Sequence, residues 1–256
     1  MTSSSPVRRI SLIIDAVAAS RGGMTLGEIA SVVELPLSTV HRTLNILLDV
    51  GYLKIEPTAK AYEIGDRLKR VLLLDLCAGS LGEIARPNVV ELAEYFTESA
   101  FVAQLTSSGV QLVDFYLPTK GSRTLVHPGF EFPMHATAAG KSIFAFQSEE
   151  AVKTEMAKGL ARHMPNTITS RKMIRAELAK IRDQGYAVND VELDPGVYAV
   201  AAPVSMGNGL VIGALAVVGI RNRLLKHHKE DEISRRVMEA AKEVSRLMAN
   251  TTTPVK

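Results

Sequence analysis

Residues 25–64 constrain the fold of this chain most, because their pattern changes from helical to alternating within a short distance. Thr25 followed by Glu28 is a capping box, which starts a helix that we expect to reach residue 33. After the tight turn at residues 34–36, apolar residues recur at helical spacing over residues 37–50. Two short alternating runs, 52–55 and 61–64, then indicate a β-hairpin. The order helix, turn, helix, hairpin predicts a small winged domain.

The second of these helices has two chemically different faces. Val40, Leu44, Leu47 and Leu48 share one face and predict contact with a core. The opposite face is polar and carries Ser38, Thr39, His41, Arg42 and Asn45. Two helices joined by a tight turn, with the second polar on one side, are typical of a helix-turn-helix whose second helix enters the major groove.

The side chains on the polar face suit contacts with DNA. Arg42 can donate two hydrogen bonds to guanine O6 and N7, and Asn45 suits adenine. Ser38, Thr39 and His41 suit phosphates or base edges near the helix N-terminus. The other reading of these residues is a small helical subdomain with a solvated polar face.

Basic residues outside this helix extend the predicted interface. Lys60, in the hairpin, would contact the DNA backbone as part of a wing. Arg8 and Arg9 precede a first helix that we expect over residues 11–19, and from there they would reach a minor groove. The net charge of the chain is only +3, so DNA binding has to rest on local geometry rather than on bulk electrostatics.

Several features predict a cytoplasmic protein. The single cysteine, Cys77, excludes an internal disulfide and a cysteine zinc cluster, and we interpret it as a small buried hydrophobic residue rather than a redox sensor. The longest apolar run, residues 210–220, is well short of the ~20 residues that span a bilayer. Asp15 interrupts the apolar start of the chain, which argues against a signal peptide.

The rest of the chain alternates helices with hairpins. Residues 66–77 are apolar around most of a helix, and the pattern breaks at residues 78–80, where we place a domain boundary. The pattern beyond it predicts an α+β domain around an antiparallel sheet. We expect helices near 87–97, from 137, and over 149–158, 171–184 and 229–249, with strands at 101–105, 110–117, 197–205 and 210–220.

Motifs spread along the chain identify a family resemblance. They are Leu35 to Leu44, Gly51-Tyr52-Leu53, Tyr62 to Gly65, Pro133 to Lys141, Thr167-Ile168-Thr169, Gly185-Tyr186, and Glu192 through Gly196 to Val204. In this order and spacing the sequence resembles the IclR family of bacterial transcriptional regulators. The resemblance implies a winged helix-turn-helix (residues 1–65), a linker helix that helps dimerise (66–80), a GAF-like effector-binding domain (81–250) and a flexible tail (251–256). It also implies a homodimer or a dimer of dimers that binds double-stranded operator DNA and a small-molecule effector.

The resemblance also places an effector site, formed by Phe130, Met134, Ala138, Ala139, Asn189, Asp190 and Ala199. Asn189 stands where Asp is common in the family, and Ala199 stands where Cys is common. These departures favour a larger, aromatic carboxylate or amide over a small oxoacid. The small residues from Thr137 to Gly140 would let a carboxylate approach the first turn of a helix, or let that helix pack closely on the sheet.

Other chemistry fits the sequence less well. Gly140-Lys141-Ser142 imitates the end of a P-loop, but His135 occupies the position of the required earlier glycine. His127 and His135 with Asp114 or Glu192 offer metal ligands, but nothing in the sequence fixes their geometry. We therefore expect no catalytic residues, no metal and no cofactor. The rival classes are an enzyme that uses the C-terminal domain and an architectural DNA-binding protein that senses nothing.

Overall fold

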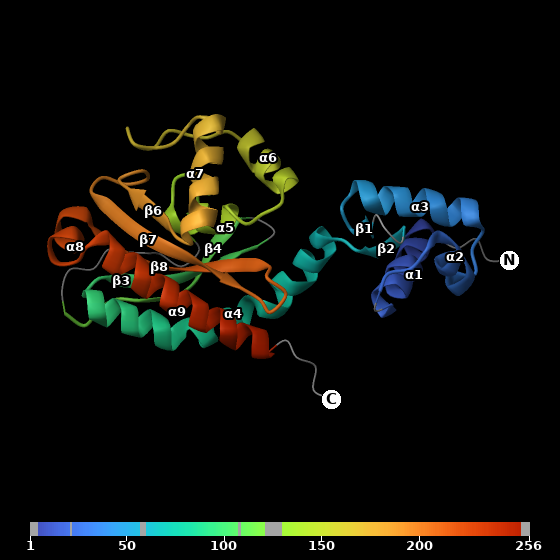
Figure 1. Ribbon diagram of the computed structural model, residues 1–256, viewed down its shortest axis with the longest axis horizontal. Coiled ribbons are helices and arrows are strands. Elements are labelled where there is room, and N and C mark those ends of the chain that lie inside the picture. The colour runs from blue at the N-terminus through green and yellow to red at the C-terminus, as the bar shows by residue number, and fades with distance from the viewer. Residues whose placement is uncertain (1–4, 21, 57–59, 107–108, 121–129, 252–256) are drawn as a thin grey trace. The chain divides into compact units, whose positions relative to one another are not determined.

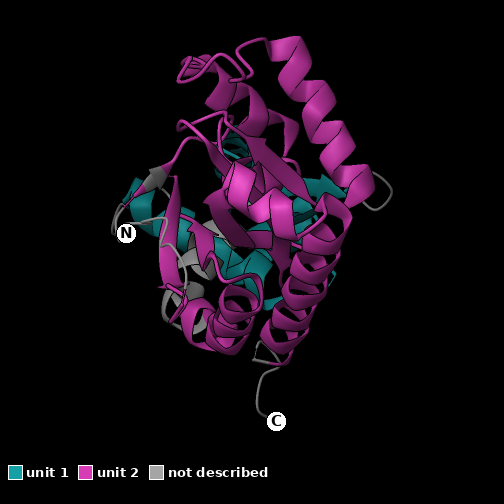
Figure 2. Ribbon diagram, turned by 90° about the vertical axis from the view of Figure 1, so that its left-hand side faces the viewer, with its two compact units in different colours: residues 1–76 teal, residues 77–256 magenta. Residues whose placement is uncertain are grey.

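The chain folds into two compact units, residues 1–76 and residues 77–256 (Figure 2). The computed structural model describes residues 5–20, 22–56, 60–106, 109–120 and 130–251. For residues 66, 69–80, 131 and 251 it describes the backbone alone. The side chains of Cys77 and of the leucines at 72–74 therefore lie outside the described part, as do residues 121–129 with His127.

The first unit has the predicted order of three helices and a hairpin. Its elements are α1 (Pro6–Ala19), α2 (Leu26–Val33), α3 (Leu37–Asp49), β1 (Leu53–Glu56) and β2 (Ala61–Ile64). The two strands pair in antiparallel fashion, with Leu53 opposite Ile64. One core gathers side chains from all five elements, among them Ile13, Ile29, Leu44, Leu53 and Tyr62.

The first helix starts earlier than expected. Ser5 caps α1 by accepting a hydrogen bond from the Arg8 N–H (3.4 Å), and Pro6 occupies the first helical position. A capping serine followed by proline is a strong helix start, and it outweighs the polar character of the first turns. The prediction that Arg8 and Arg9 precede the first helix is therefore wrong, because both lie within α1.

Helix α4 (Asp66–Phe96) is continuous for 31 residues. The predicted end of the helix at residues 78–80 and the separate helix from 87 are therefore wrong. A glycine in a helix interior costs about 1 kcal/mol, which favourable packing can exceed. Here Leu81, Ala85 and Val89 lie one helical turn apart and are fully buried, so packing carries the helix past Gly79 and through Pro87.

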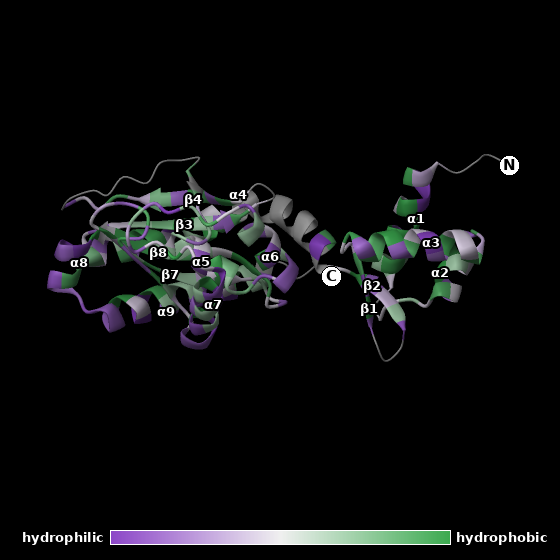
Figure 3. Cartoon of the chain, turned by 90° about the horizontal axis from the view of Figure 1, so that it is seen from above, coloured by the Kyte–Doolittle hydropathy of each residue, from purple (hydrophilic) through white to green (hydrophobic). Residues whose placement is uncertain are grey.

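The second unit is built around a six-stranded sheet in the order β5-β4-β3-β8-β7-β6. Every neighbouring pair of strands is antiparallel, which confirms the predicted sheet. The strands are β3 (Ser99–Leu105), β4 (Val110–Tyr116), β5 (Glu131–Phe132), β6 (Ala187–Asp190), β7 (Val197–Ser205) and β8 (Val211–Ile220). The central strands β3 and β8 are hydrophobic through most of their length, as Figure 3 shows.

Helices cover both faces of this sheet (Figure 1). The helices that follow β5 along the chain are α5 (Ala138–Phe144), α6 (Glu149–Ala157), α7 (Arg171–Gln184), α8 (Arg221–His227) and α9 (Glu230–Thr251). Helix α9 packs on β7 and β8 on one face, which it shares with the second half of α4. Helix α5 packs on the other face, against β6, β7 and β8, and α7 packs on α5. Along the described ranges, no helix is both long and apolar enough to cross a membrane.

Three short elements of the second unit were not predicted: β5, β6 and α8. Strand β6 is the most important of them, because Asn189 and Asp190 lie within it, although none of the expected strands includes these residues. The sequence Ala187-Val188-Asn189-Asp190 ends in two strongly polar residues, so the alternation that identifies a strand is too short to recognise.

Candidate functional site

The polar face of α3 is exposed, as its sequence predicts. Val40, Leu44 and Leu47 point into the core of the first unit and are at most 2% exposed. Ser38, His41, Arg42 and Asn45 are exposed, and Thr39 is half-buried. The structure thus brings the five predicted DNA-contacting residues of α3 onto one helix, and four of them are open to solvent.

Helix α2 begins with a capping box and is joined to α3 by a short turn. Thr25 accepts from the Glu28 N–H, and the Glu28 carboxylate accepts from the Thr25 N–H (2.8 Å), so the capping box is present. The hydrogen bond from the Thr25 N–H lowers the pKa of Glu28. Glu34 ends α2 in the left-handed conformation (φ +52°), and α3 begins three residues later, after Pro36. This is a tight helix-turn-helix.

The hairpin carries two lysines with different surroundings. Lys60 is exposed and lies in the left-handed region at φ +50°, directly before β2. Lys54 on β1 forms an ion pair with Glu63 on β2 (3.3 Å), so its charge is partly compensated. Residues 57–59, the rest of the wing tip, lie outside the described ranges. On α1, Arg8 is exposed and Arg9 is half-buried.

The predicted effector site begins at the N-terminus of α5. Thr137 caps this helix: its hydroxyl accepts from the Gly140 N–H and donates to the Pro133 carbonyl oxygen (3.0 Å each). A Cβ atom at Gly140 would lie 2.7 Å from the Met134 Cα, so glycine lets the turn at residues 133–137 close on the helix. Met134, Ala138 and Ala139 are all buried here.

Two of the predicted residues on the strands share the face that α5 covers. Asn189 on β6 pairs with Ala199 on β7, and directly opposite residues of paired strands point to the same face. The Asn189 amide nitrogen donates to the Ala136 carbonyl oxygen (2.9 Å), which fixes that face. The Asn189 amide oxygen accepts from the Glu192 N–H (3.0 Å). The nitrogen and the oxygen of the Asn189 side-chain amide are thus both hydrogen-bonded within the protein, and Asn189 joins the α5 turn to the sheet.

The other two predicted residues lie apart from this group. Side chains alternate along a strand, so Asp190 points to the opposite face from Asn189. There it forms a two-point ion pair with Arg221 (2.6 and 3.2 Å). Phe130, which is 37% exposed, packs edge-on against Phe132 on β5, and Phe132 stacks on Phe101 of β3. Phe130 therefore belongs to an aromatic group on the β5 side of the sheet.

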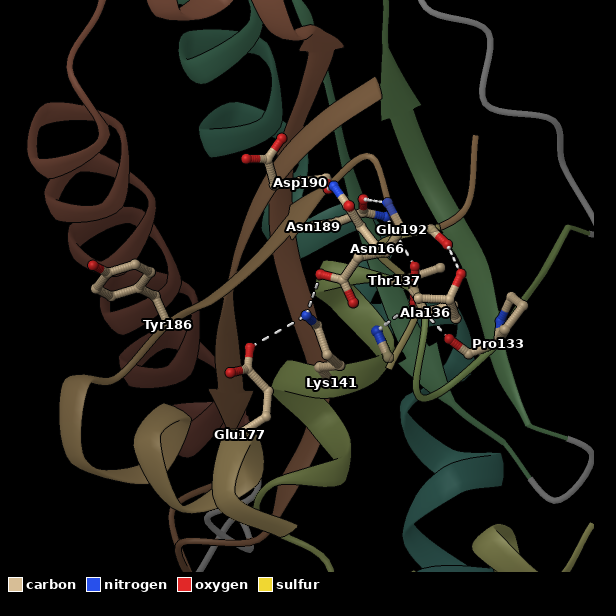
Figure 4. A network of polar contacts seen from close by, with 12 residues as sticks. Pro133, Ala136, Thr137, Lys141, Asn166, Glu177, Tyr186, Asn189, Asp190 and Glu192 are labelled. Atoms are coloured by element: carbon tan, nitrogen blue, oxygen red, sulfur yellow. Dashed lines mark hydrogen bonds and ion pairs between the residues drawn. The ribbon is translucent and has the colours of Figure 1, made fainter. Parts of the chain in front are cut away.

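A buried ionic network lies next to the α5 turn (Figure 4). The Lys141 ammonium contacts the Glu192 carboxylate (2.5 Å) and the Glu177 carboxylate on α7 (3.2 Å). The Lys141 side chain is 1% exposed and the Glu192 side chain 9%. Burial raises the pKa of Glu192, although Lys141 opposes the shift. The carbonyl oxygen of Glu192 accepts from the Thr167 hydroxyl (2.6 Å).

Sequence reasoning did not predict this network. The sequence places Lys141 and Glu192 in family motifs, and otherwise suggests them only for a P-loop and a metal site. The available signal was a lysine inside an otherwise apolar and small-residue helix, since a buried lysine needs an acidic partner. The metal site does not form among the described residues: Asp114 pairs with Arg86 (2.8 Å), Glu192 pairs with Lys141, and His127 is not described.

Comparisons with known proteins agree with this architecture. The model of the IclR helix-turn-helix domain matches residues 6–57, and that of the bacterial transcriptional regulator IclR C-terminal domain matches residues 78–246. The transcriptional repressor IclR of Escherichia coli is 29% identical over 91% of this chain and 86% of its own length. The HTH-type transcriptional regulator BhcR of Paracoccus denitrificans is 29% identical over 93% of this chain and 85% of its own.

A solved structure shares the fold at lower identity. An IclR homologue from Microbacterium hydrocarbonoxydans, crystallised with 4-hydroxybenzoate, superposes with a TM-score of 0.61 at 22% identity, covering 97% of this chain and all of its own. The family models and the relatives describe transcriptional regulators rather than enzymes. With both domain models matched in order along most of its length, this chain belongs to the IclR family of DNA-binding transcriptional regulators.

Proposed function

We propose that this protein is an effector-responsive regulator of a catabolic operon. In this proposal it acts in the cytoplasm as a homodimer or a dimer of dimers, and each dimer reads a pseudo-palindromic operator with two copies of α3. The observation that carries the proposal is the exposed polar face of α3, presented by a unit that is separate from the sheet-containing second unit. One unit would read DNA while the other binds the signal.

The proposed DNA contacts fall into two classes. Arg42 and Asn45 contact base edges in the major groove, and Ser38, Thr39 and His41 contact phosphates or bases near the start of α3. Lys60, Arg8 and Arg9 contact the backbone, and their contribution should depend on salt. The position of Arg8 and Arg9 within α1 favours backbone contacts over insertion into a minor groove.

The proposed effector lies between the α5 turn and the sheet. Met134, Ala138 and Ala139 would form one wall and Ala199 the other. Phe130 would contact the ligand from the β5 side of the sheet. Asn189 would act by holding the two walls together, because the nitrogen and the oxygen of its side-chain amide are both hydrogen-bonded within the protein. Asp190 points to the opposite face, so its proposed part is limited to supporting β6. The apolar walls favour an aromatic ring in the ligand, and the N-terminal turn of α5 favours its carboxylate or amide group.

One experiment tests both halves of this proposal. The intact protein is used to select duplexes from a random library, and the recovered duplex is then titrated with and without candidate ligands. 4-Hydroxybenzoate, its amide and a short oxoacid serve as probes, and thermal unfolding is followed in parallel, because a ligand that binds the native state raises the melting temperature. We expect a recovered palindrome and a ligand that changes both the melting temperature and the affinity for DNA.

The rival classes predict different results. Duplexes without a shared sequence, combined with no thermal shift across a broad metabolite screen, would indicate an architectural DNA-binding protein. Chemical conversion of a bound ligand would indicate an enzyme. Either result would refute the proposed function.

A further inference from the structure

Four buried side chains and one half-buried side chain, Glu177, join separate segments of the second unit to the loop between β6 and β7, residues 191–196 (Figure 4). They are Lys141, Thr167, Glu177, Asn189 and Glu192, and we call them the clasp. Lys141 connects the loop to α5 and, through Glu177, to α7. Asn189 connects the loop to the turn at residues 133–137. All of these connections converge on Glu192.

Thr167 adds a further segment to the clasp. Its hydroxyl donates to the Glu192 carbonyl oxygen (2.6 Å) and accepts from the backbone N–H groups of His163 (3.1 Å) and Met164 (2.8 Å). Asn166 next to it donates to the Asp190 carbonyl oxygen (2.9 Å). The loop after β6 is thus fixed on both sides of residue 191.

Val191 lies between these fixed points in an unfavourable conformation. Its φ angle is +58°, in the left-handed region that β-branched residues rarely adopt. Its N–H donates to the Val197 carbonyl oxygen (2.9 Å), which closes the loop. A residue stays in such a conformation only when its surroundings hold it there. Here the surroundings are the clasp residues on either side, Asn189 and Glu192.

The clasp also leaves one polar atom without a partner. The Glu192 carboxylate has one oxygen on Lys141, while its Oε2 atom is buried and makes no hydrogen bond to the described residues. Lys141 compensates the charge of Glu192, but this carboxylate oxygen has lost its contact with water without gaining a partner. Burying a polar atom without a hydrogen bond is costly, so the closed arrangement is opposed by both backbone strain and this unpaired oxygen.

We propose that the loop after β6 is a two-state element, held closed by the clasp against the strain at Val191, and that it positions the two walls of the effector site. When the clasp opens, Val191 relaxes to an ordinary backbone conformation, and the turn at residues 133–137 loses its connection to β6. Lys141, Asn189 and Glu192 are therefore positioning residues. The inference rests on the proposed effector site for its functional meaning, but the two states exist without any ligand.

The test is hydrogen exchange on the intact, ligand-free protein. Lys141→Met should speed amide exchange about tenfold or more in residues 133–140 and 189–197 while leaving β3 and β8 unchanged, because only the local opening is altered. Lys141→Arg, which keeps the charge, should restore most of the protection. Arg175→Met is the matched control, since it breaks an exposed ion pair between α7 and Glu149 and should change neither segment.

Val191→Gly tests whether backbone strain at residue 191 opposes the closed loop. Glycine removes the strain, so adding it to Lys141→Met should return exchange in residues 189–197 to within about threefold of the wild type. If Lys141 only filled a buried site, glycine at residue 191 would not compensate for its loss. Should Lys141→Met fail to fold, Asn189→Ala gives the same comparison with and without Val191→Gly.

The results separate this inference from the proposed function. Unchanged exchange in residues 189–197, an equal increase across β3 and β8, or no suppression by Val191→Gly would overturn the two-state loop. A ligand screen without any thermal shift would overturn the effector site alone, because the exchange measurements use no ligand.

Discussion

The Glu98 carboxyl group lies directly against the backbone of Gly219, where a Cβ atom would come within 2.5 Å of the carboxyl carbon. Glu98 is 1% exposed and forms a two-point ion pair with Arg223 at the start of α8. Residue 219 thus has to be glycine for the buried carboxylate to reach its partner. This pair joins the beginning of β3 to the helix that follows β8.

Gly219→Ala should lower the free energy of unfolding of the second unit by about 1–3 kcal/mol, because the new methyl group displaces the Glu98 carboxylate. Denaturant titration followed by circular dichroism measures the change. Gly27→Ala in the first unit is a suitable control for replacing glycine by alanine, since Gly27 is exposed, a Cβ atom there meets nothing within 4 Å, and alanine favours helix α2. A stability equal to that of the wild type in Gly219→Ala would show that the carboxylate has room to move.

Arg42→Ala should weaken binding to the selected operator by about 1–3 kcal/mol and relax the preference at one position of each half-site, since a two-point contact to guanine is lost. The measurement is a titration against duplexes substituted singly at each position. Arg246→Ala, on the exposed surface of α9, should leave both affinity and preference unchanged. Retained preference at every position would remove Arg42 from base reading.

Lys60→Ala should instead weaken binding to all duplexes alike and reduce the slope of log affinity against log salt by about one, because it contacts the backbone. Lys54→Ala is the matched comparison on the same hairpin. Its effect should be smaller, because Glu63 already compensates part of the Lys54 charge. A loss confined to one base pair would contradict a backbone contact by Lys60.

Local signals account for what the sequence predicted well. The capping box at Thr25 and Glu28, and the helical spacing of Val40 and Leu44, depend on residues a few positions apart. The clasp has no such signal, because Lys141 is 36 residues from Glu177 and 51 from Glu192. No periodicity links such residues, and only the folded sheet brings them together.

The errors at α1 and α4 have the opposite cause. At residues 78–80 and at Pro87 the local residues favour a helix end, yet Leu81, Ala85 and Val89 bury their side chains and keep α4 intact. Burial of Leu81 and of Val89 contributes about 1.5–3 kcal/mol each, which together offsets the cost of about 3 kcal/mol for proline and about 1 kcal/mol for a glycine inside a helix. At α1, one capping residue and one proline changed where Arg8 and Arg9 lie.

Leu72→Glu together with Leu74→Glu should dissociate the protein and abolish tight operator binding. The sequence of α4 at these residues is apolar around most of the helix, more than one packing face needs. An operator with two half-sites also requires two copies of α3. Light scattering at micromolar concentration measures the mass, and the selected duplex measures binding. A monomeric wild type would refute the proposed dimer.

Ala199→Leu should remove the thermal shift produced by the ligand that the screen identifies, because the larger side chain fills the face of β7 opposite Asn189. Operator affinity without ligand should stay within about tenfold of the wild type, since the two sites are coupled only through the equilibrium between conformations. Ala199 is 6% exposed, so overpacking lowers stability as well. Ala199→Ser, which nearly preserves volume, should keep the thermal shift. If Ala199→Leu binds the ligand as the wild type does, the effector lies elsewhere in the second unit.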